Sequence, residues 1–386
     1  MKVNEIEISG FKGITYLIIH PKKINIFVGK NNTGKTSILE AISSTLESNI
    51  YDMQTKYSSH LSSLININKK ESKVIVKLEN ENKYLLLRIP ELIEIIPEFK
   101  TQLIEKIKLI SHPTIKENEW KKIEELLDKI LSNEDLLHKI KKESIRIESG
   151  NKVSYVFSYT SILKELEPLI EHLNKNILHM GINPLLFFLS RSKYSFSSIT
   201  DENSKIFVFI KNLIGKTLLS SMNKSKINDI ENYLKNKKIL ENLERFDIDK
   251  LLFKNNEKEY EIPFSFMGDG FKALIGLIVQ MPKEAKIVLI EEPENHMHPA
   301  YIKEIVQQII NFSMTNDTQF FITTHNSDIL DIVSTDILEP QYQEYLSKEL
   351  NLIRLDWLND NIMVQELNKK EALEELEELK IDLRGK

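Results

Sequence analysis

Cysteine is absent from the 386-residue sequence, and no long hydrophobic run is present. The lack of cysteine excludes disulfides, thiolate zinc sites and cysteine nucleophiles, and it is typical of an intracellular chain. The longest convincing apolar stretch, 273–281, has about half the length that a bilayer span requires. The first residues, MKVNEIEISGF, include acidic side chains and no apolar core of a signal peptide. We therefore expect a soluble, cytoplasmic protein with no membrane partner.

Excess charge of either sign is also missing, since the net charge is −5 and 28% of residues are charged. With 41% apolar residues, this is the balance of an ordinary globular protein with a sizeable core. A weakly acidic chain has no general attraction to nucleic acid, so any such contact would need a local basic patch.

The N-terminal part of the chain has the pattern of strands around one helix. Apolar alternation and short apolar runs predict strands at 3–8, 14–20 and 23–28, a helix at 35–46, and a β-hairpin from 73–78 and 84–89. Residues 95–183 differ, because Lys and Glu alternate there with Ile and Leu at helical spacing. We interpret 95–183 as a mainly helical insertion with one β-hairpin at 144–159, and 1–94 with 184–386 as the main domain.

The second half begins with a candidate buried strand at 185–189 and a helical region at 200–245 that is rich in lysine. The lysines are Lys211, Lys216, Lys224, Lys226, Lys235, Lys237 and Lys238. They could face a phosphate backbone, although an ordinary solvated face is favoured. From 270 to 333 helices alternate with strands at 287–290 and 320–323, which predicts a parallel βαβ sheet. A hairpin and a helix at 369–379 follow.

A complete G-x-x-x-x-G-K-[ST] motif lies between a predicted strand and a predicted helix. Its glycines let backbone N–H groups wrap phosphates, and the helix directs its positive end at them. Lys35 is expected to reach the β and γ phosphates and to act in catalysis, while Thr36 should bind Mg²⁺. The expected nucleotide-binding residues of this loop are Gly29, Asn31, Asn32, Thr33, Gly34, Lys35, Thr36 and Ser37.

Two further strands end in groups that suit phosphate chemistry. The run 287–290 delivers Glu291 and Glu292 at the strand end where parallel sheets bind ligands. We expect Glu291 in the Mg²⁺ shell and Glu292 beside the water that attacks the γ phosphate. The second run, 320–324, ends in His325, whose imidazole could contact the same phosphate and water.

A glycine-rich turn opens the helix at 270–281. Its residues Ser265, Gly268 and Gly270 are expected to bind phosphate through backbone amides. A simple N-capped helix is the alternative reading of this turn.

Taken in this order, the four elements resemble the ABC-type ATPases of the RecF, SMC and OLD (overcoming lysogenization defect) group. The opening motif Ile8-Ser9-Gly10-Phe11-Lys12-Gly13, the acidic segment 291–299 and the segment Thr324-His325-Asn326-Ser327 each have a counterpart there. The resemblance implies an α/β fold, an ABC-ATPase head with a mixed N-terminal β lobe and a parallel sheet with flanking helices. It also implies ATP with Mg²⁺, and a homodimer or higher assembly in which Ser265, Gly268 and Gly270 bind ATP on another subunit. Asn295 and His298 would then lie at the same interface.

The chain departs from the pattern of this group at several positions. Met267-Gly268 replaces the serine of the signature turn, and Glu291 replaces the commoner aspartate. The glutamine of the Q-loop has only two early candidates, Gln54 and Gln102. Arg191 is a further candidate, because 186–191 resembles a strand of the group that ends in arginine.

Three functions are compatible with this resemblance. Many OLD proteins continue into a Toprim nuclease domain, whereas only 61 residues follow His325, and the one Asp-x-Asp pair, Asp247 with Asp249, precedes the signature turn. We therefore expect an ATPase that is not a nuclease, dimerises on ATP and controls a separately encoded effector, such as a nuclease in antiviral defence. The alternatives are a RecF-like DNA clamp in DNA repair, which uses the lysines, and an ATP-binding regulatory module with little turnover.

Overall fold

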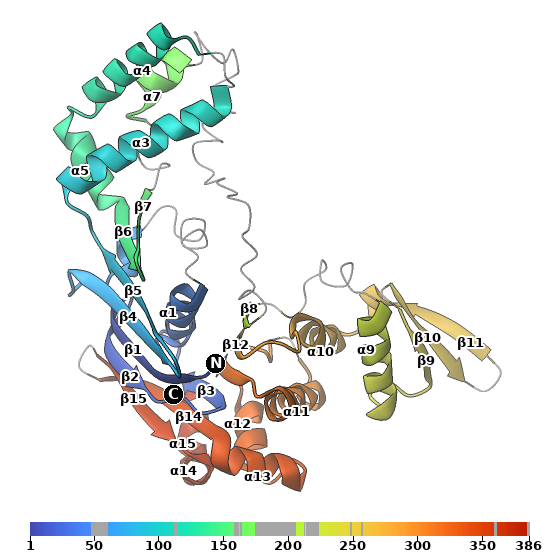
Figure 1. The fold of residues 1–386 in the computed structure, drawn as a ribbon. Helices are drawn as coiled ribbons and strands as arrows, with labels where there is room; N and C mark the ends of the chain where they lie inside the picture. The colour runs from blue at the N-terminus through green and yellow to red at the C-terminus, as the bar shows by residue number, and fades with distance from the viewer. Residues whose placement is uncertain are drawn as a thin grey trace.

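The computed structural model describes residues 1–47, 61–111, 115–157, 162, 164–173, 206–211, 213, 224–247, 249–255, 258–295, 297–358 and 361–383. A central sheet and an N-terminal sheet form the body of the molecule. A helical arm stands above the N-terminal sheet, and a small lobe projects to the other side (Figure 1).

The central sheet has six strands in the order β15-β14-β3-β13-β12-β8. The strands are β3 (Ile24–Gly29), β8 (Phe207–Ile210), β12 (Ile287–Glu291), β13 (Gln319–Thr323), β14 (Leu350–Leu358) and β15 (Asn361–Leu367). All neighbouring pairs are parallel except β14 with β15. The parallel sheet and the α/β class expected from the alternating pattern are thereby confirmed.

Both faces of the central sheet are buried, which explains the unbroken apolar runs of its strands. Val288 and Ile290 face one core with helices α10 to α13, whereas Ile287 and Leu289 face α1 and the N-terminal sheet. The flanking helices are α1 (Lys35–Glu47), α10 (Asp269–Gln280), α11 (Pro299–Asn316), α12 (Ser327–Ser334), α13 (Pro340–Glu349), α14 (Lys369–Glu374) and α15 (Leu376–Leu383).

The N-terminal sheet is antiparallel, in the order β2-β1-β4-β5-β6-β7. Its strands are β1 (Val3–Phe11), β2 (Ile14–Ile19), β4 (Glu71–Leu78), β5 (Asn82–Arg88), β6 (Ser144–Ser149) and β7 (Lys152–Phe157), and a short 3-10 turn, η1 (Leu61–Leu64), precedes β4. The hairpin β6–β7 had been expected within the insertion, but it extends this sheet. Leu85 and Leu87 of β5 share one core with Ile145 and Ile147 of β6, so the register places the hairpin there.

The arm leaves the N-terminal sheet after β5 and returns through β6. It consists of α3 (Leu92–Ser111), α4 (Glu117–Ile130), α5 (Glu134–Lys142) and α7 (Glu167–Leu173), which enclose their own core around Phe99. At its base, Glu94 accepts hydrogen bonds from Arg88 of β5 and from Arg146 of β6. These guanidinium groups hold the pKa of Glu94 at about 2. The charged contact fixes the arm to the sheet; the division of the chain into domains at 94 and 184 stays a prediction.

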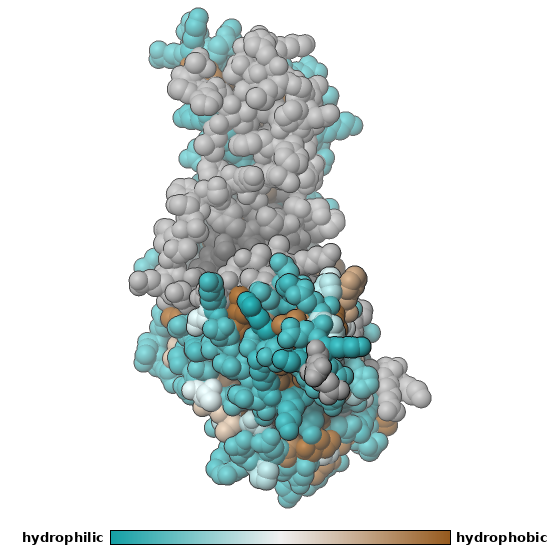
Figure 2. Space-filling model, turned by 90° about the vertical axis from the view of Figure 1, so that its right-hand side faces the viewer, coloured by the Kyte–Doolittle hydropathy of each residue, from teal (hydrophilic) through white to brown (hydrophobic). Residues whose placement is uncertain are grey.

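The lobe contains α9 (Lys224–Asn236) and the antiparallel strands β9 (Leu243–Phe246), β10 (Lys250–Asn255) and β11 (Lys258–Pro263). The prediction of a helical region at 200–245 is wrong at β8 and β9. Aromatic and β-branched residues 207–210 instead form the edge strand beside β12, because this placement buries Ile210 in the core. In Figure 2, which views the side from which the lobe projects, the coloured surface in the lower half is mostly hydrophilic with several hydrophobic patches.

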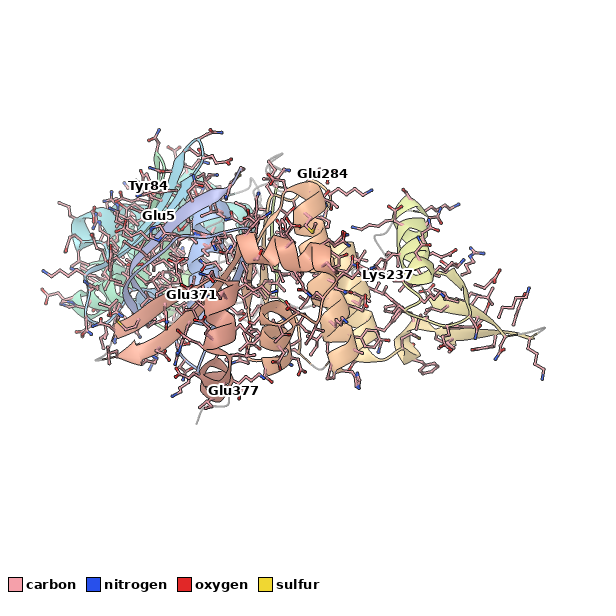
Figure 3. All side chains as sticks on the ribbon, turned by 90° about the horizontal axis from the view of Figure 1, so that it is seen from below. Glu5, Tyr84, Lys237, Glu284, Glu371 and Glu377 are labelled. Carbon is pink, nitrogen blue, oxygen red and sulfur yellow. The ribbon has the colours of Figure 1, made fainter. Side chains whose placement is uncertain are left out.

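Three lysines of the predicted lysine face make local contacts. Lys226 donates a hydrogen bond to the carbonyl of Val279, and Lys235 pairs with Glu231 at 2.7 Å. Lys237, labelled beside the lobe in Figure 3, lies 3.9 Å from Glu339. Lys216 and the strand expected at 185–189 lie outside the described residues. Within the described segments, no helix combines the length and the apolar character needed to cross a membrane.

Gln319 joins the two large sheets. Its side chain is fully buried on β13, and its amide accepts from the N–H of Val3 at 2.8 Å. It donates to the carbonyls of Val3 and Lys22 at 3.0 and 2.8 Å. The carbonyl of Lys22 also accepts from Asn25 Nδ2 at 2.8 Å, so loss of the amide would mainly affect the backbone groups of Val3.

We predict that Gln319→Leu destabilises the fold by about 2–4 kcal/mol, because each buried polar group left unpaired costs about 1–3 kcal/mol. Urea unfolding measures the change. The matched control is Gln365→Leu, whose exposed amide donates to Glu375 at 2.9 Å; it should change stability by less than about 0.5 kcal/mol. Equal shifts in the two variants would contradict the role of Gln319.

Candidate functional site

Several strands of the central sheet end at one edge, and the residues that follow them form the candidate site. The loop 29–36 follows β3, Glu291 and Glu292 end β12, and His325 follows β13. Backbone hydrogen bonds join these segments where they leave the strands. Thr324 donates its N–H to Phe27 O and Glu292 donates its N–H to Thr323 O, both at 3.1 Å. The predicted convergence of these three segments is therefore present, at the edge where parallel sheets bind ligands.

Two glycines allow the loop after β3 to turn tightly. Gly29 has φ +144° and Gly34 has φ +89°, which are conformations that side chains rarely adopt. A β-carbon at Gly29 would lie 2.3 Å from the carbonyl oxygen of Leu355, and one at Gly34 would lie 2.9 Å from Ile362 Cδ1. Asn32, with φ +64°, supplies a third left-handed residue of a type that tolerates it. The loop is thus built to present backbone rather than side chains.

Lys35 lies within this loop. Its Nζ donates to the carbonyls of Gly29 and Lys30 at 2.8 and 2.7 Å and lies 3.5 Å from Thr33 Oγ1. Burial lowers its pKa to about 8, and the charge of Glu292 opposes that shift. The ammonium is therefore charged at neutral pH and held where a bound phosphate chain would meet it.

The remaining predicted binding residues of the loop differ in exposure. Asn31 and Asn32 are exposed, Thr33 is buried and donates its hydroxyl to Lys30 O at 2.9 Å, and Ser37 is half-buried in the first turn of α1. Thr33 thus closes the turn, and contact of these residues with a nucleotide stays a prediction.

The two predicted metal ligands lie side by side. Thr36 donates its hydroxyl to Glu291 Oε1 at 2.8 Å. A hydroxyl and a carboxylate are oxygen donors that suit Mg²⁺, an ion that proteins hold by one or two such groups together with substrate phosphates and water. No cluster of three His, Asp or Glu side chains that could hold a metal occurs in the described parts of the chain. Thr36 and Glu291 fit an ion that arrives with a nucleotide.

Glu292 and His325 form the second pair of the site. His325 Nε2 lies 3.0 Å from Glu292 Oε1. Burial lowers the pKa of His325, the charge of Lys35 lowers it further, and Glu292 opposes both. The imidazole is therefore neutral near pH 7, and in the tautomer with its proton on Nε2 it donates to the carboxylate.

The backbone of Glu292 is strained, which the sequence does not reveal. It has φ +45°, a left-handed conformation that costs a residue with a side chain about 1–2 kcal/mol. Two hydrogen bonds hold Glu292 in this conformation. Its N–H donates to Thr323 O at 3.1 Å, and its Oε2 accepts from Asn295 Nδ2 at 3.0 Å. Strain of this kind collects where function fixes the direction of a side chain.

Glu294 has a structural role that the sequence analysis did not predict. Its Oε1 accepts from the hydroxyl of Thr324 at 2.6 Å and from the N–H of His325 at 2.8 Å, while its buried Oε2 has no hydrogen-bond partner among the residues that the structure describes. Burial raises the pKa of Glu294 more than these two bonds lower it, so this carboxyl keeps its proton to a higher pH than an ordinary glutamate. The side chain ties the end of β12 to the backbone of His325. The sequence feature that could have indicated this role is the position of Glu294 two residues after Glu292.

Two lysines beside Glu291 were also missed as site residues. Lys12, in the opening motif, pairs with the buried Glu40 of α1. Burial lowers the pKa of Lys12 to about 8. The charge of Lys211 acts in the same direction, and the charge of Glu291 opposes the shift. Lys211 directly follows β8 and lies 4.7 Å from the ring centre of Phe209. Because Ile210 is the register partner of Ile290, Lys211 lies at the end of β8 next to the end of β12, and not on α9 with other lysines of the predicted lysine face.

The signature turn opens α10. It follows a 3-10 turn, η6 (Phe264–Phe266), and Gly268 is the N-cap of α10 without a side-chain cap. Ser265 and Gly268 are exposed. Gly270 is buried, and a β-carbon there would lie 2.7 Å from Tyr301 Cδ2. Close packing on α11 explains this glycine, and nucleotide contact by the turn stays a prediction.

Other candidates from the sequence lie at or away from the site. Asn295 contacts Glu292, as described, and His298 is the N-cap of α11, accepting from Ala300 N at 3.3 Å. Gln102 lies on α3 of the arm, far from β3 and β12 (Figure 1), and donates to Tyr155 O at 3.1 Å. It is therefore not a Q-loop residue in this arrangement. Gln54 and Arg191 lie outside the described residues.

We predict that Mg·ATP affinity falls as pH rises above 8, by up to tenfold per pH unit. The reason is that Lys35 must be protonated to bind phosphate, and its pKa in the free protein is about 8. Calorimetric titrations from pH 6.5 to 9.5 measure this. Lys35→Arg stays charged throughout and should lose the dependence; Lys12→Arg is measured in parallel because its pKa is also about 8. An unchanged decline in both variants would contradict the assignment.

We predict opposite outcomes for two substitutions of Glu294. Glu294→Gln keeps the acceptor oxygen and the shape of the neutral acid, so ATP hydrolysis should stay within about threefold of the parent. Glu294→Ala frees the backbone of His325, and hydrolysis should fall about 10- to 100-fold, as expected when the predicted catalytic group His325 is displaced. Turnover is measured at saturating and limiting ATP, with thermal unfolding as a check on folding. Similar loss in both variants would exclude positioning by the carbonyl oxygen.

Comparison with known proteins gives relatives of limited extent. An uncharacterised protein of Methanocaldococcus jannaschii is 30% identical over 122 residues, which are 31% of this chain and 100% of that protein. An ATP/GTP phosphatase of Helicobacter pylori is 28% identical over 97 residues, which are 24% of this chain and only 26% of that protein. The SMC head domain of Thermotoga maritima covers 95% of this chain and 100% of its own at 11% identity, with a TM-score of 0.45, which is too low to establish a shared fold.

The family is given by a sequence profile that matches most of the chain. Residues 24–331 match the family described as "AAA domain, putative AbiEii toxin, Type IV TA system". This range contains the loop 29–36, the signature turn, the pair Glu291 and Glu292, and His325. The match agrees with the predicted P-loop ATPase. The chain belongs to this family of P-loop ATPase domains.

Proposed function

We propose that this chain binds Mg·ATP at the loop 29–36 and hydrolyses it as a face-to-face dimer, and that this cycle controls a separately encoded effector. One observation supports the chemistry above all. The pair of Thr36 and Glu291 and the pair of Glu292 and His325 lie at the same sheet edge as Lys35, with contacts of 2.8 and 3.0 Å.

The residues of the site divide the hydrolysis among them. Lys35 turns from the carbonyls of its loop to the β and γ phosphates. Thr36 and Glu291 would hold a Mg²⁺ ion, which would neutralise phosphate charge. Glu292 accepts a proton from water as the water oxygen bonds to the γ phosphorus and the bond from that phosphorus to the β–γ bridging oxygen breaks. His325, neutral and bonded to Glu292, keeps the carboxylate directed at the water. ADP and phosphate are the products.

The signature turn supports the dimer. The first turn of α10 has no side-chain cap, Gly268 has open space around it, and Phe266 is 79% exposed. Free N–H groups at a helix start suit an anion. In the ABC-type group that the chain resembles, such a turn binds ATP held by the partner. Asn295, which contacts Glu292, would then sense that contact.

The control of an effector rests on the family and the relatives. The family description names a putative toxin of a type IV toxin–antitoxin system, and such a system has a second component besides the toxin. One relative is named an ATP/GTP phosphatase, which agrees with nucleotide hydrolysis. A nuclease that acts in antiviral defence is the effector we propose, with the ATPase located in the cytoplasm.

The RecF-like DNA clamp is less well supported. It needs several lysines on one open face, whereas Lys226 and Lys235 make contacts within the protein. Lys211 follows Ile210, the register partner of Ile290, and therefore lies at the end of β8 next to the end of β12. Phosphate contacts would appear as DNA binding that requires ATP and weakens steeply with salt. Such binding would favour the clamp, and a flat titration would favour the effector.

We predict that Glu292→Gln lowers ATP hydrolysis by about 10²- to 10⁴-fold, as expected for loss of a general base, while ATP binding persists. Because the trapped ATP keeps two heads together, a dimer should accumulate on Mg·ATP, measured by light scattering beside phosphate release. Lys35→Ala should abolish both, and the exposed Glu339→Gln is the matched control that should change neither. Hydrolysis at the parental rate in Glu292→Gln would indicate a regulatory module whose turnover does not use this site.

A further inference from the structure

Trp357 lies against the phosphate-binding loop from the hairpin of β14 and β15. Its indole Nε1–H donates to the carbonyl of Asn32 at 3.0 Å, yet 47% of the side chain is exposed. Its register partner on β15 is Ile362, whose side chain packs against Gly34. The Nε1 edge of the ring is thus hydrogen-bonded to the loop, while much of the ring remains exposed to solvent.

The order of the strands indicates which end of a nucleotide would lie near Trp357. On one side of β3 lie β13 and β12, which carry His325 and Glu292 at their ends; on the other side lie β14 and β15. A terminal phosphate between Lys35 and Glu292 therefore points toward β12. The nucleoside, at the other end of the same molecule, extends away from β12, toward β14.

We propose that Trp357 is the platform on which the base of the bound nucleotide stacks, an inference that rests on the proposed binding of a nucleoside triphosphate by the loop 29–36. Every nucleobase has a π face that stacks on an indole, so this contact adds affinity without identifying the base. The hydrogen-bonding edge of the indole is already occupied by Asn32. Trp357 therefore binds adenine and guanine alike, with affinities for ATP and GTP within about tenfold of each other.

A purely structural role would use Trp357 differently. A tryptophan that only anchors the hairpin would bury both faces of its ring in a core, as Phe27 and Phe321 do on the same side of the sheet. Trp357 instead combines one fixed edge with high exposure. A contact with a second copy of the chain is the other possible use of an exposed ring, and concentration dependence distinguishes it.

The chain offers an internal probe, because it has two tryptophans, Trp120 and Trp357. Trp120 lies on α4 of the arm, so Trp120→Phe leaves Trp357 as the sole indole reporter. We expect Mg·ATP and Mg·GTP to quench its fluorescence. Mg·tripolyphosphate, which has no base, should compete for the same site and leave the fluorescence nearly unchanged. Quenching of equal size by tripolyphosphate would overturn stacking.

Affinities of variants complete the test. Trp357→Ala should weaken ATP binding about 5- to 100-fold and leave tripolyphosphate binding within about twofold. Trp357→Phe keeps an aromatic face without the N–H and should stay within about threefold for both. If Trp357→Ala loses affinity for ATP and tripolyphosphate equally, Trp357 only supports the loop. If affinity is lost only at concentrations that form dimers, Trp357 is a subunit contact. Either result overturns the proposal. If the parent binds neither compound, the nucleotide site itself fails, which separates that failure from the failure of stacking.

Discussion

The parallel pairing of β3 with β13 and of β13 with β12 is the constraint on which the site depends. Strands that run in one direction end at one edge, so segments nearly 300 residues apart along the chain meet there. Burial of both faces fixes the register of these strands, since a slip by one residue would exchange the two cores. The positions of Lys35, Glu292 and His325 are therefore set by hydrophobic packing far more than by contacts among themselves.

The positive charges of the two lysines in the site are balanced by nearby carboxylates. Lys35 and Lys12 both have pKa values lowered to about 8 by burial, and carboxylates of Glu292 and Glu291 oppose the shifts. Both ammonium groups thus remain charged at neutral pH although they are partly withdrawn from water. A triphosphate would add negative charge where these cations lie, which gives the site an electrostatic reason to bind it. Burial disfavours charge at Glu294 as well, and there it raises the pKa of the carboxyl.

The sequence predicted the parts of this arrangement that local pattern controls. The spacing of glycines and Lys35, and the apolar runs before Glu291 and His325, were sufficient to place three segments at one sheet edge. It could not show the left-handed backbone of Glu292, the buried Glu294 or the approach of Lys12 and Lys211 to Glu291, because each depends on contacts between distant segments. The strand at 207–210 was missed for the same reason: its apolar residues fit a helix as well as an edge strand until β12 is there to pair with it. The hairpin after β5 was recognised, but its membership of the N-terminal sheet required the pairing with Leu85 and Leu87.

The hairpin of β14 and β15 brings two properties of the chain together. It completes the central sheet beside β3, and through Leu355 and Ile362 it dictates that Gly29 and Gly34 carry no side chain. The fold and the phosphate-binding loop are thus coupled on one side, as Glu294 couples β12 and β13 on the other. The most direct test of the account is a calorimetric titration of the purified chain with a non-hydrolysable ATP analogue and Mg²⁺. The account predicts one nucleotide per chain, and none for Lys35→Ala; absence of binding to the parent chain, or equal binding to both, would contradict it.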